Sequence, residues 1–187
     1  MCASSKEAIL AAARQEAQAR GYGGLNFRTL AAEVGVKAAS LYHHFPSKAD
    51  LGAAVARRYR EDTAAHLETL AVACADPVLS LRRYPDTFKK ALETDNRLCL
   101  ASFMAAEYDD LPDAVKTEVQ AFADVNVAWL ARMLTAAGVV EAKDAEPRAR
   151  AIFAAVVGAQ LMARSRADIA LYDAVIDSYR TAGLLPA

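Results

Sequence analysis

The chain has 187 residues, of which 55% are hydrophobic and 24% are charged, and its formal net charge is −1. Residues 1–60 carry nine Lys or Arg against four Asp or Glu, whereas the remaining residues carry thirteen against nineteen. A basic amino-terminal part on an acidic body is typical of a polyanion-binding module joined to a separate partner domain. No apolar run approaches the ~20 residues that span a bilayer. The amino terminus has no secretory signature, so we expect a cytoplasmic protein without a membrane part.

Apolar periodicity and the positions of glycine and proline predict an all-α chain of about nine helices without a strand. The loops are short, and no flexible linker or internal repeat is evident. In chain order we expect helices at residues 5–20, 27–34, 38–45 and 48–74, from 77 onward, and at 96–107, 112–137, 145–164 and 168–183.

Capping residues and helix breakers set the expected helix ends. The expected caps are Asn26, Ser47 together with Asp50, Asp76, Asn96 and Asp168. Pro85 should kink or split the fifth helix near Tyr84, because proline lacks the backbone N–H that a helix interior requires. Pro147 is expected in the first turn of the eighth helix, where proline is tolerated.

Residues 27–51, FRTLAAEVGVKAASLYHHFPSKADL, have the pattern of a helix-turn-helix. Small Ala31 lets two short helices cross closely, and Gly35 permits a tight left-handed turn between them. Apolar Leu41 then locks the second helix against the first, and Pro46 ends that helix. These elements agree with one another, so the segment predicts a compact DNA-binding unit.

The sequence LYHHF followed by PSKADL resembles the amino-terminal domain of TetR-family transcriptional regulators. In that family a tyrosine–x–x–phenylalanine, then serine–lysine and a leucine, close the DNA-binding unit. The close match covers roughly residues 6–60, and the remainder resembles the family in length, all-helical pattern and helix count. The resemblance implies a DNA-binding domain over residues 1–50 and a ligand-binding and dimerisation domain over residues 51–187.

The chain departs from the family pattern at two places. Ala38 and Ala39 stand where the family often has a polar residue and a glycine, which leaves fewer groups for base contacts. Thr29 stands where an acidic residue often completes a capping box.

The second helix of the motif should present one face to DNA. Successive helical residues turn by about 100°, so a buried Leu41 places Ala39, Ser40 and His43 on the opposite face. Tyr42 lies on the flank of that face. Ser40 and His43 can donate to base edges or phosphates, and Ala39 can contact a thymine methyl group.

Basic residues around the motif complete the expected interface. Lys37 can reach a phosphate or a guanine, and Lys48 sits beside the free amides at the start of the fourth helix, which favour an anion. The resemblance implies that Tyr42 and Lys48 hold phosphates and that Arg28 lies near base edges. The candidate DNA-binding residues are Arg28, Lys37, Ala38, Ala39, Ser40, Tyr42, His43 and Lys48. His44 should project back toward the first helix, and the adjacent histidines diverge too far to hold a metal.

The central helices contain the residues of a candidate pocket for a small-molecule inducer. Its apolar candidates are Phe88, Leu92, Cys99, Phe103, Met104, Phe122, Val125 and Trp129, with Tyr108, Asn126 and Arg97 as polar anchors. For any single one of these residues, ordinary core packing is the simpler explanation.

The last two helices are apolar on several faces and rich in small residues, which predicts a two-fold four-helix interface between two copies of the chain. The candidate interface residues are Ala151, Ala155, Gly158, Ala159, Met162, Tyr172 and Ile176. An intramolecular core is the alternative. Dimerisation also follows from DNA recognition, because one small helix-turn-helix reads few base pairs.

The sequence therefore predicts a homodimeric regulator that a small molecule releases from a near-palindromic DNA operator. Two alternatives stay open: a regulator that senses oxidants or electrophiles through Cys99 or Cys74, and a helical enzyme. No nucleophile–base pair, phosphate loop or metal cluster is readable for the enzyme. The three cysteines, Cys2 included, are an odd number without metal-ligand spacing, so we expect no disulfide framework, metal or cofactor.

Overall fold

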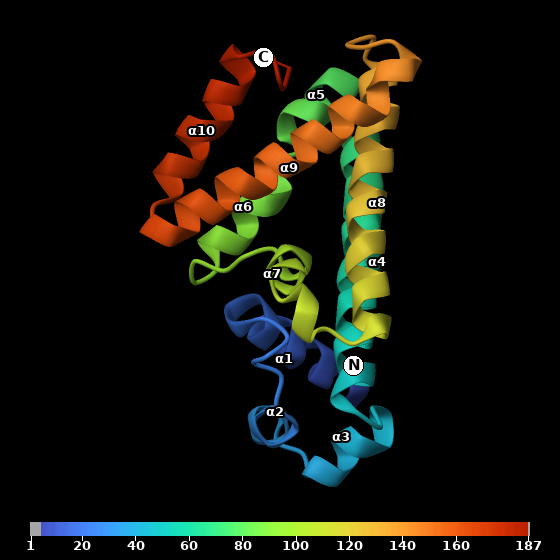
Figure 1. The fold of residues 1–187 in the computed structure, drawn as a ribbon, viewed down its shortest axis with the longest axis vertical. Helices are drawn as coiled ribbons and strands as arrows, with labels where there is room; N and C mark the ends of the chain where they lie inside the picture. Colours follow the sequence, from blue (N-terminus) through green and yellow to red (C-terminus); the bar gives the residue numbers. More distant parts are fainter. Residues whose placement is uncertain (1–4, 187) are drawn as a thin grey trace. The chain divides into compact units, whose positions relative to one another are not determined.

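In the computed structural model, which describes residues 5–186, all regular secondary structure is helical (Figure 1). Within that range the helices are α1 Ser5–Arg20, α2 Phe27–Val34, α3 Ala38–His44, α4 Lys48–Cys74, α5 Pro77–Arg83, α6 Asp86–Glu93, α7 Leu100–Ala106, the short 3-10 helix η1 Tyr108–Asp110, α8 Asp113–Ala136, α9 Ala142–Arg166 and α10 Ile169–Thr181. The all-α prediction is confirmed. Pro85 divides the expected fifth helix into α5 and α6, as the sequence indicated. Cys2 lies outside the described residues.

The sixth expected helix begins later than the sequence predicted. Asp95 and Asn96 have left-handed φ angles of 56° and 53°, and the backbone N–H of Asn96 donates to the carbonyl of Leu92 at 3.0 Å. The side chain of Asn96 donates to the carbonyl of Arg164 at 3.0 Å. Asn96 thus closes the turn after α6, and the prediction that it caps the next helix is wrong.

The helix α9 begins before the predicted start, so Pro147 lies inside it and not in its first turn. Proline at this position leaves the carbonyl of Lys143 without an amide partner from the helix. Because Lys143 is exposed, water can donate a hydrogen bond to that carbonyl, and the helix tolerates the proline.

The chain divides into two compact units. The first unit comprises the described residues up to Glu61 together with Leu100–Ala121, and the second comprises Asp62–Cys99 and the residues from Phe122 onward. Both α4 and α8 contribute residues to each unit. The expected functional division into residues 1–50 and 51–187 stays a prediction.

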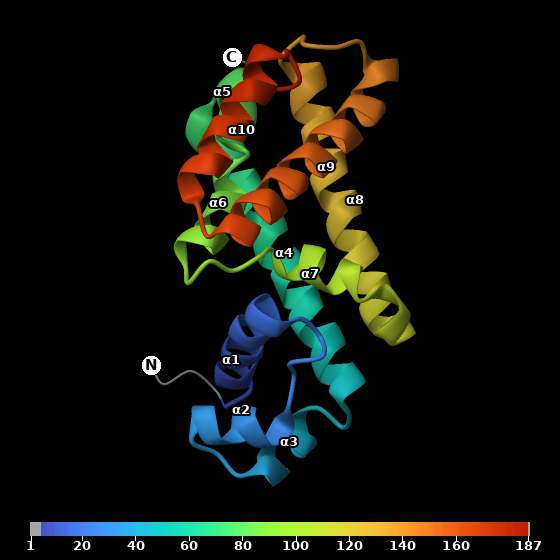
Figure 2. The ribbon, with the colours of Figure 1, turned by 60° about the vertical axis from the view of Figure 1, so that its left-hand side comes forward.

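In the first unit, α1 packs against α2, α3 and α7 (Figure 2). The side chains of Ile9, Leu30 and Leu41 are fully buried in the core that these helices share. Burying each such side chain stabilises the unit by about 1.5–3 kcal/mol relative to leaving it exposed. This core holds the helix-turn-helix in place.

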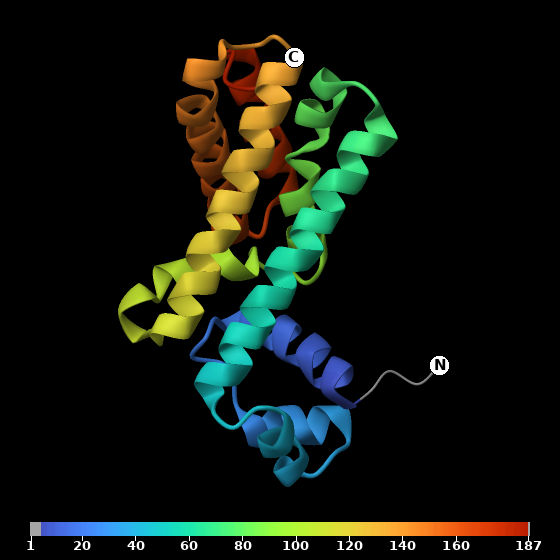
Figure 3. The same cartoon turned by 90° about the vertical axis from the view of Figure 1, so that its right-hand side faces the viewer.

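In the second unit, α9 packs against α6 and α10 (Figure 3). Aromatic rings are among the buried side chains of this unit. Tyr84 stacks on Trp129 with ring centroids 5.7 Å apart, and its hydroxyl donates to Oδ1 of Asn126 at 2.9 Å. Burial raises the pKa of Tyr84 well above its ordinary value, so the hydroxyl stays a donor. Gln160 donates to the carbonyl of Phe88 at 2.7 Å, so this core satisfies several of its polar groups internally.

No helix within residues 5–186 is both long and apolar enough to cross a membrane.

Candidate functional site

The helix-turn-helix forms as its sequence predicted. Oδ1 of Asn26 accepts the backbone N–H groups of Arg28 at 2.9 Å and Thr29 at 3.2 Å, which caps α2. Gly35 has a φ of 75° and ends α2 in the left-handed conformation that glycine adopts without strain. The hydroxyl of Ser47 accepts the backbone N–H of Asp50 at 3.1 Å and caps the start of α4.

The predicted recognition face of α3 is exposed in the structure. Leu41 is fully buried and Phe45 is 3% exposed, whereas Ala39 and His43 on the opposite side are exposed. Ala38 and Ser40 are half-buried. The orientation of α3 thus agrees with the 100° step argument, and contact of this face with DNA stays a prediction.

Neighbouring aromatic and polar side chains hold α3 in position. The ring of Tyr42, which is 58% exposed, lies with its centroid 4.7 Å from that of Phe27 at the start of α2. Nε2 of His44 lies 2.9 Å from the hydroxyl of Ser5. This contact confirms that His44 faces the first helix.

Lys48 has two contacts that the sequence did not predict. Its ammonium donates to the carbonyl of Gly23 at 3.1 Å and lies 4.6 Å from the ring centroid of Tyr22. Lys48 is half-buried, whereas Arg28 and Lys37 are exposed. The predicted phosphate ligand is therefore seated on the turn between α1 and α2.

Several positive charges of the amino-terminal segment belong to internal ion pairs. Arg58 makes two hydrogen bonds to Glu7, at 2.8 and 2.9 Å. Arg57 and Arg60 donate to opposite oxygens of Glu118 at 2.7 and 3.0 Å. Burial alone raises the pKa of Glu118, but the hydrogen bonds and charges of the two arginines outweigh burial and lower it.

These three arginines account for a third of the nine basic residues in residues 1–60. The excess positive charge in the sequence thus overstates the charge that is free for a polyanion. Arg28 and Lys37 on the exposed surface, with Lys48, are the basic residues that the motif itself presents.

Most of the predicted pocket residues are packed as core in the second unit or belong to the first. Phe103, Met104 and Tyr108 lie in the first unit, where Met104 is buried and Tyr108 is 51% exposed. Most of the remaining candidates are buried in the second unit: Phe88, Leu92, Cys99, Phe122, Asn126 and Trp129. Their role in ligand binding stays a prediction, and ordinary core packing describes what the structure shows of the buried ones.

The second unit has a groove of about 360 Å³ between α4 and α8. It is lined by Ala64, Leu67, Glu68, Val125, Ala128, Trp129 and Arg132. Glu68 and Arg132 form an ion pair beside it. Of the predicted pocket residues, Val125 and Trp129 line this groove. The groove itself was not predicted, because the small side chains of Ala64 and Ala128 give no sequence signal of the space that they leave.

The candidate dimer residues divide into an exposed and a buried set. Ala151, Gly158 and Met162 are exposed on α9, and Ala155 is half-buried. The buried set is Ala159, Tyr172 and Ile176, each at most 3% exposed. The hydroxyl of Tyr172 donates to the carbonyl of Pro85 at 2.8 Å. In the single chain these three side chains thus pack in the core of their own unit, and their part in a dimer interface stays a prediction.

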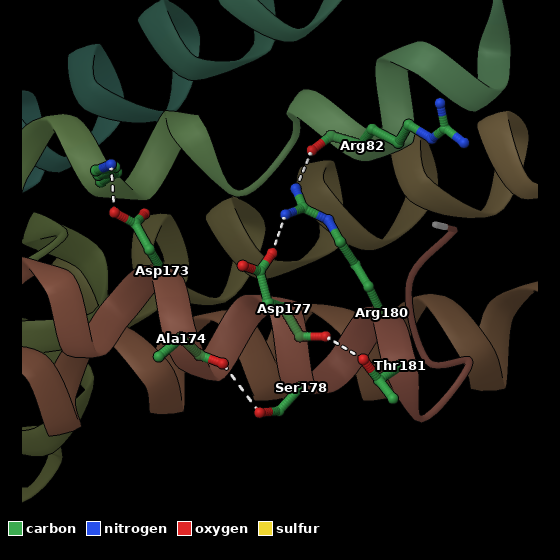
Figure 4. A network of polar contacts seen from close by, with 8 residues as sticks. Arg82, Asp173, Ala174, Asp177, Ser178, Arg180 and Thr181 are labelled. Atoms are coloured by element: carbon green, nitrogen blue, oxygen red, sulfur yellow. Dashed lines mark hydrogen bonds and ion pairs between the residues drawn. The ribbon is translucent and has the colours of Figure 1, made fainter.

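Asp173 and Arg180 of α10 reach residues of α6 and α5 in the same unit (Figure 4). Asp173 pairs with Lys89 at 2.8 Å, and Arg180 joins Asp177 at 2.7 Å to the carbonyl of Arg82 at 3.0 Å. The hydroxyls of Ser178 and Thr181 donate to carbonyls of α10 itself. Ala170, Ala174, Ser178 and Thr181 therefore form an exposed strip of small side chains whose hydroxyls already have partners.

Two cysteines, Cys74 and Cys99, lie within the described residues. Cys99 is 1% exposed, and Cys74 is half-buried at the end of α4. A thiol buried in apolar surroundings is usually inert. Among residues 5–186 no group of three or more His, Cys, Asp or Glu is placed to hold a metal ion.

A capped helix-turn-helix with an exposed, partly basic face on an all-α body defines a DNA-binding transcriptional regulator. Residues 9–55 match the family model described as bacterial regulatory proteins, tetR family. This match covers the helix-turn-helix and supports the resemblance of the chain to TetR-family transcriptional regulators.

Solved structures extend the similarity over nearly the whole chain. A TetR transcriptional regulator from Legionella pneumophila is 26% identical, with 97% of this chain and 98% of that chain covered and a TM-score of 0.90. A TetR-family regulator from Agrobacterium tumefaciens is 29% identical, with 93% and 94% covered and a TM-score of 0.86. The regulator FadR from Bacillus subtilis, solved with stearoyl-CoA, is 17% identical and shares the fold, with 92% and 96% covered and a TM-score of 0.69. No curated protein matched the sequence.

Proposed function

We propose that the protein is a homodimeric regulator that binds a near-palindromic operator in the cytoplasm and leaves it when a small molecule binds. The observation that carries the DNA-binding part is the free face of α3, where Ala39, Tyr42 and His43 are exposed while Leu41 and Phe45 anchor the helix. The operator is found by selecting bound duplexes from a random pool. Enrichment of an inverted repeat with half-sites about one helical turn apart supports the proposal, and enrichment of no sequence contradicts it.

The outer surface of α9 supports the dimer. Leu161 and Met162 are 57% and 47% exposed, which is unusual for large apolar side chains. Gly158 lies one turn before them, and a Cβ built on it meets nothing within 4 Å. A second copy of α9 can approach closely at such a site, and the strip of small side chains on α10 adds a surface without unpaired hydroxyls. A two-fold axis through these faces covers both apolar residues on each copy.

The groove between α4 and α8 is the site that we propose for the inducer. Leu67, Val125 and Trp129 give it apolar walls, and Arg132 can exchange Glu68 for an acidic group of a ligand. The indole N–H of Trp129 is buried without a hydrogen-bond partner, which costs about 1–3 kcal/mol. The expected inducer is a small apolar molecule with one acidic or acceptor group. FadR, which was solved with stearoyl-CoA, shares the fold and supports a ligand in this body.

The proposed coupling runs along α4. Three groove residues, Ala64, Leu67 and Glu68, lie on the same unbroken helix as Lys48. A ligand that prefers a conformation with mis-spaced DNA-binding domains lowers operator affinity. A tenfold loss of affinity requires about 1.4 kcal/mol of differential binding.

Filling the groove is expected to abolish the response to the inducer. In Ala128→Leu the added side chain occupies the groove, while operator affinity without ligand stays unchanged because Ala128 is exposed. Compounds found through Trp129 fluorescence should lose both their signal and their effect on operator binding with this variant. The control is Ala136→Leu, an exposed position on α8 outside the groove. Unaltered responses in Ala128→Leu would place the inducer elsewhere.

A further inference from the structure

The turn between α1 and α2 is held by a carboxylate that lies far along the chain. The backbone N–H groups of Tyr22 and Gly23 donate to Oε2 and Oε1 of Glu107 at 2.6 and 3.1 Å. Glu107 directly follows α7 and is 85 residues from Tyr22 in the sequence. Both residues belong to the first unit. A carboxylate that accepts two backbone amides makes charge-assisted hydrogen bonds, which are among the stronger ones in proteins.

The same turn is held from its other side by Lys48. The ammonium donates to the carbonyl of Gly23 at 3.1 Å and lies over the ring of Tyr22. Glu107 therefore accepts the backbone amides of this turn, and Lys48 donates to one of its carbonyls. We call this arrangement of Glu107, Lys48 and residues 21–24 the turn clamp.

Glycines permit the close approach that the turn clamp needs. A Cβ on Gly21 would lie 2.2 Å from Oε2 of Glu107, and Gly21 also has a left-handed φ of 69°. A Cβ on Gly52 of α4 would lie 2.7 Å from the ring of Tyr22. These distances are too short for a real side chain, so the clamp depends on glycine at both positions.

The turn clamp leads directly to the expected DNA interface. Asn26, the cap of α2, follows the clamped turn, and its cap bond fixes the backbone of Arg28. Lys48 is itself an expected phosphate ligand. The carboxylate of Glu107 therefore acts on two candidate DNA-contacting residues at once.

We propose that Glu107 is a positioning residue for operator binding, and that its withdrawal from the α1–α2 turn lowers the affinity for the operator. This inference rests on the proposed function. It gives α7 a defined means of regulating the helix-turn-helix, because Glu107 follows the last residue of that helix.

The test compares Glu107→Gln and Glu107→Ala with Asp110→Asn, which changes an exposed carboxylate in the same segment. Hydrogen exchange of the Tyr22 and Gly23 amides is measured first, without DNA. We expect both Glu107 variants to exchange these amides at least about tenfold faster than the wild type, and Asp110→Asn to match the wild type. Unchanged exchange in both Glu107 variants overturns the clamp.

Operator affinity is measured next on the selected duplex. We expect the Glu107 variants to bind about fivefold to tenfold more weakly, which corresponds to about 1–1.4 kcal/mol. In a Lys48→Ala background the effect of Glu107→Ala should shrink, because both side chains act through the same turn. If Glu107→Ala weakened operator binding only by destabilising the fold, its loss of affinity would add in full to the loss from Lys48→Ala.

The outcomes separate this inference from the proposed function. If the wild type binds its operator and the Glu107 variants bind equally well, the inference is overturned and the proposed function stands. Full additivity of Glu107→Ala and Lys48→Ala also overturns it. If the wild type binds no sequence selectively, the proposed function fails and the positioning role fails with it, whatever the exchange data show.

Discussion

Gly158→Glu is expected to convert the protein into a folded monomer that binds its operator about 10²–10⁴-fold more weakly. Gly158 is exposed on α9, and a Cβ there meets nothing within 4 Å, so the glutamate fits the isolated chain. In the proposed dimer the same site faces its own copy across the two-fold axis. The new carboxylates would then be brought together without water or a partner, which a dimer cannot tolerate.

The affinity falls steeply because operator binding needs two half-sites at once. In a dimer the second helix-turn-helix binds at a high effective concentration, and a monomer loses that advantage. The oligomeric state is measured by sedimentation and the affinity by titration of the same sample. Ala136→Glu is the control, since it places the same side chain on an exposed part of α8. A dimer that persists in Gly158→Glu would exclude this face of α9 as the interface.

His43→Ala and Lys48→Ala are expected to weaken DNA binding in different ways. His43 is exposed on the predicted recognition face, so its loss should cost about 1–3 kcal/mol on the operator and little on a scrambled duplex. Lys48→Ala should weaken binding to both duplexes alike and reduce the salt slope by about one unit, because it removes a phosphate contact.

These two variants are compared on matched duplexes over a range of salt concentrations. Lys143→Ala serves as control, because it removes an exposed lysine near the start of α9. Identical losses for His43→Ala on operator and scrambled duplexes would remove its role in base recognition. An unchanged salt slope for Lys48→Ala would show that Lys48 contacts no phosphate and acts only through the turn clamp.

Local signals in the sequence predicted most of the fold. The cap at Asn26, the left-handed Gly35 and the break at Pro85 depend on a few neighbouring residues, and the structure confirms all three. Asn96 was misjudged because asparagine serves equally as a helix cap and as a left-handed residue. Its contact with Arg164, 68 residues away, decided between these roles.

The candidate site was predictable only where helical geometry determines it. The exposed face of α3 follows from the buried Leu41 and the angle between successive residues. The apolar pattern of α10 could not show whether Tyr172 and Ile176 face a second copy or their own core, since either arrangement requires the same row of apolar residues along one side of the helix. The contact of Glu107 with the α1–α2 turn carries no local signal, because it joins segments 85 residues apart.

Recognition of a particular DNA sequence through the helix-turn-helix is tested most directly by one titration of the wild type. Fluorescence anisotropy follows binding to the selected duplex and to a scrambled duplex at several salt concentrations. We expect the selected duplex to bind at least about 10³-fold more tightly. The logarithm of affinity should fall linearly with the logarithm of salt concentration, by about 0.9 per phosphate contacted. Equal affinity for both duplexes, or binding that does not respond to salt, would contradict sequence-specific DNA binding by this protein.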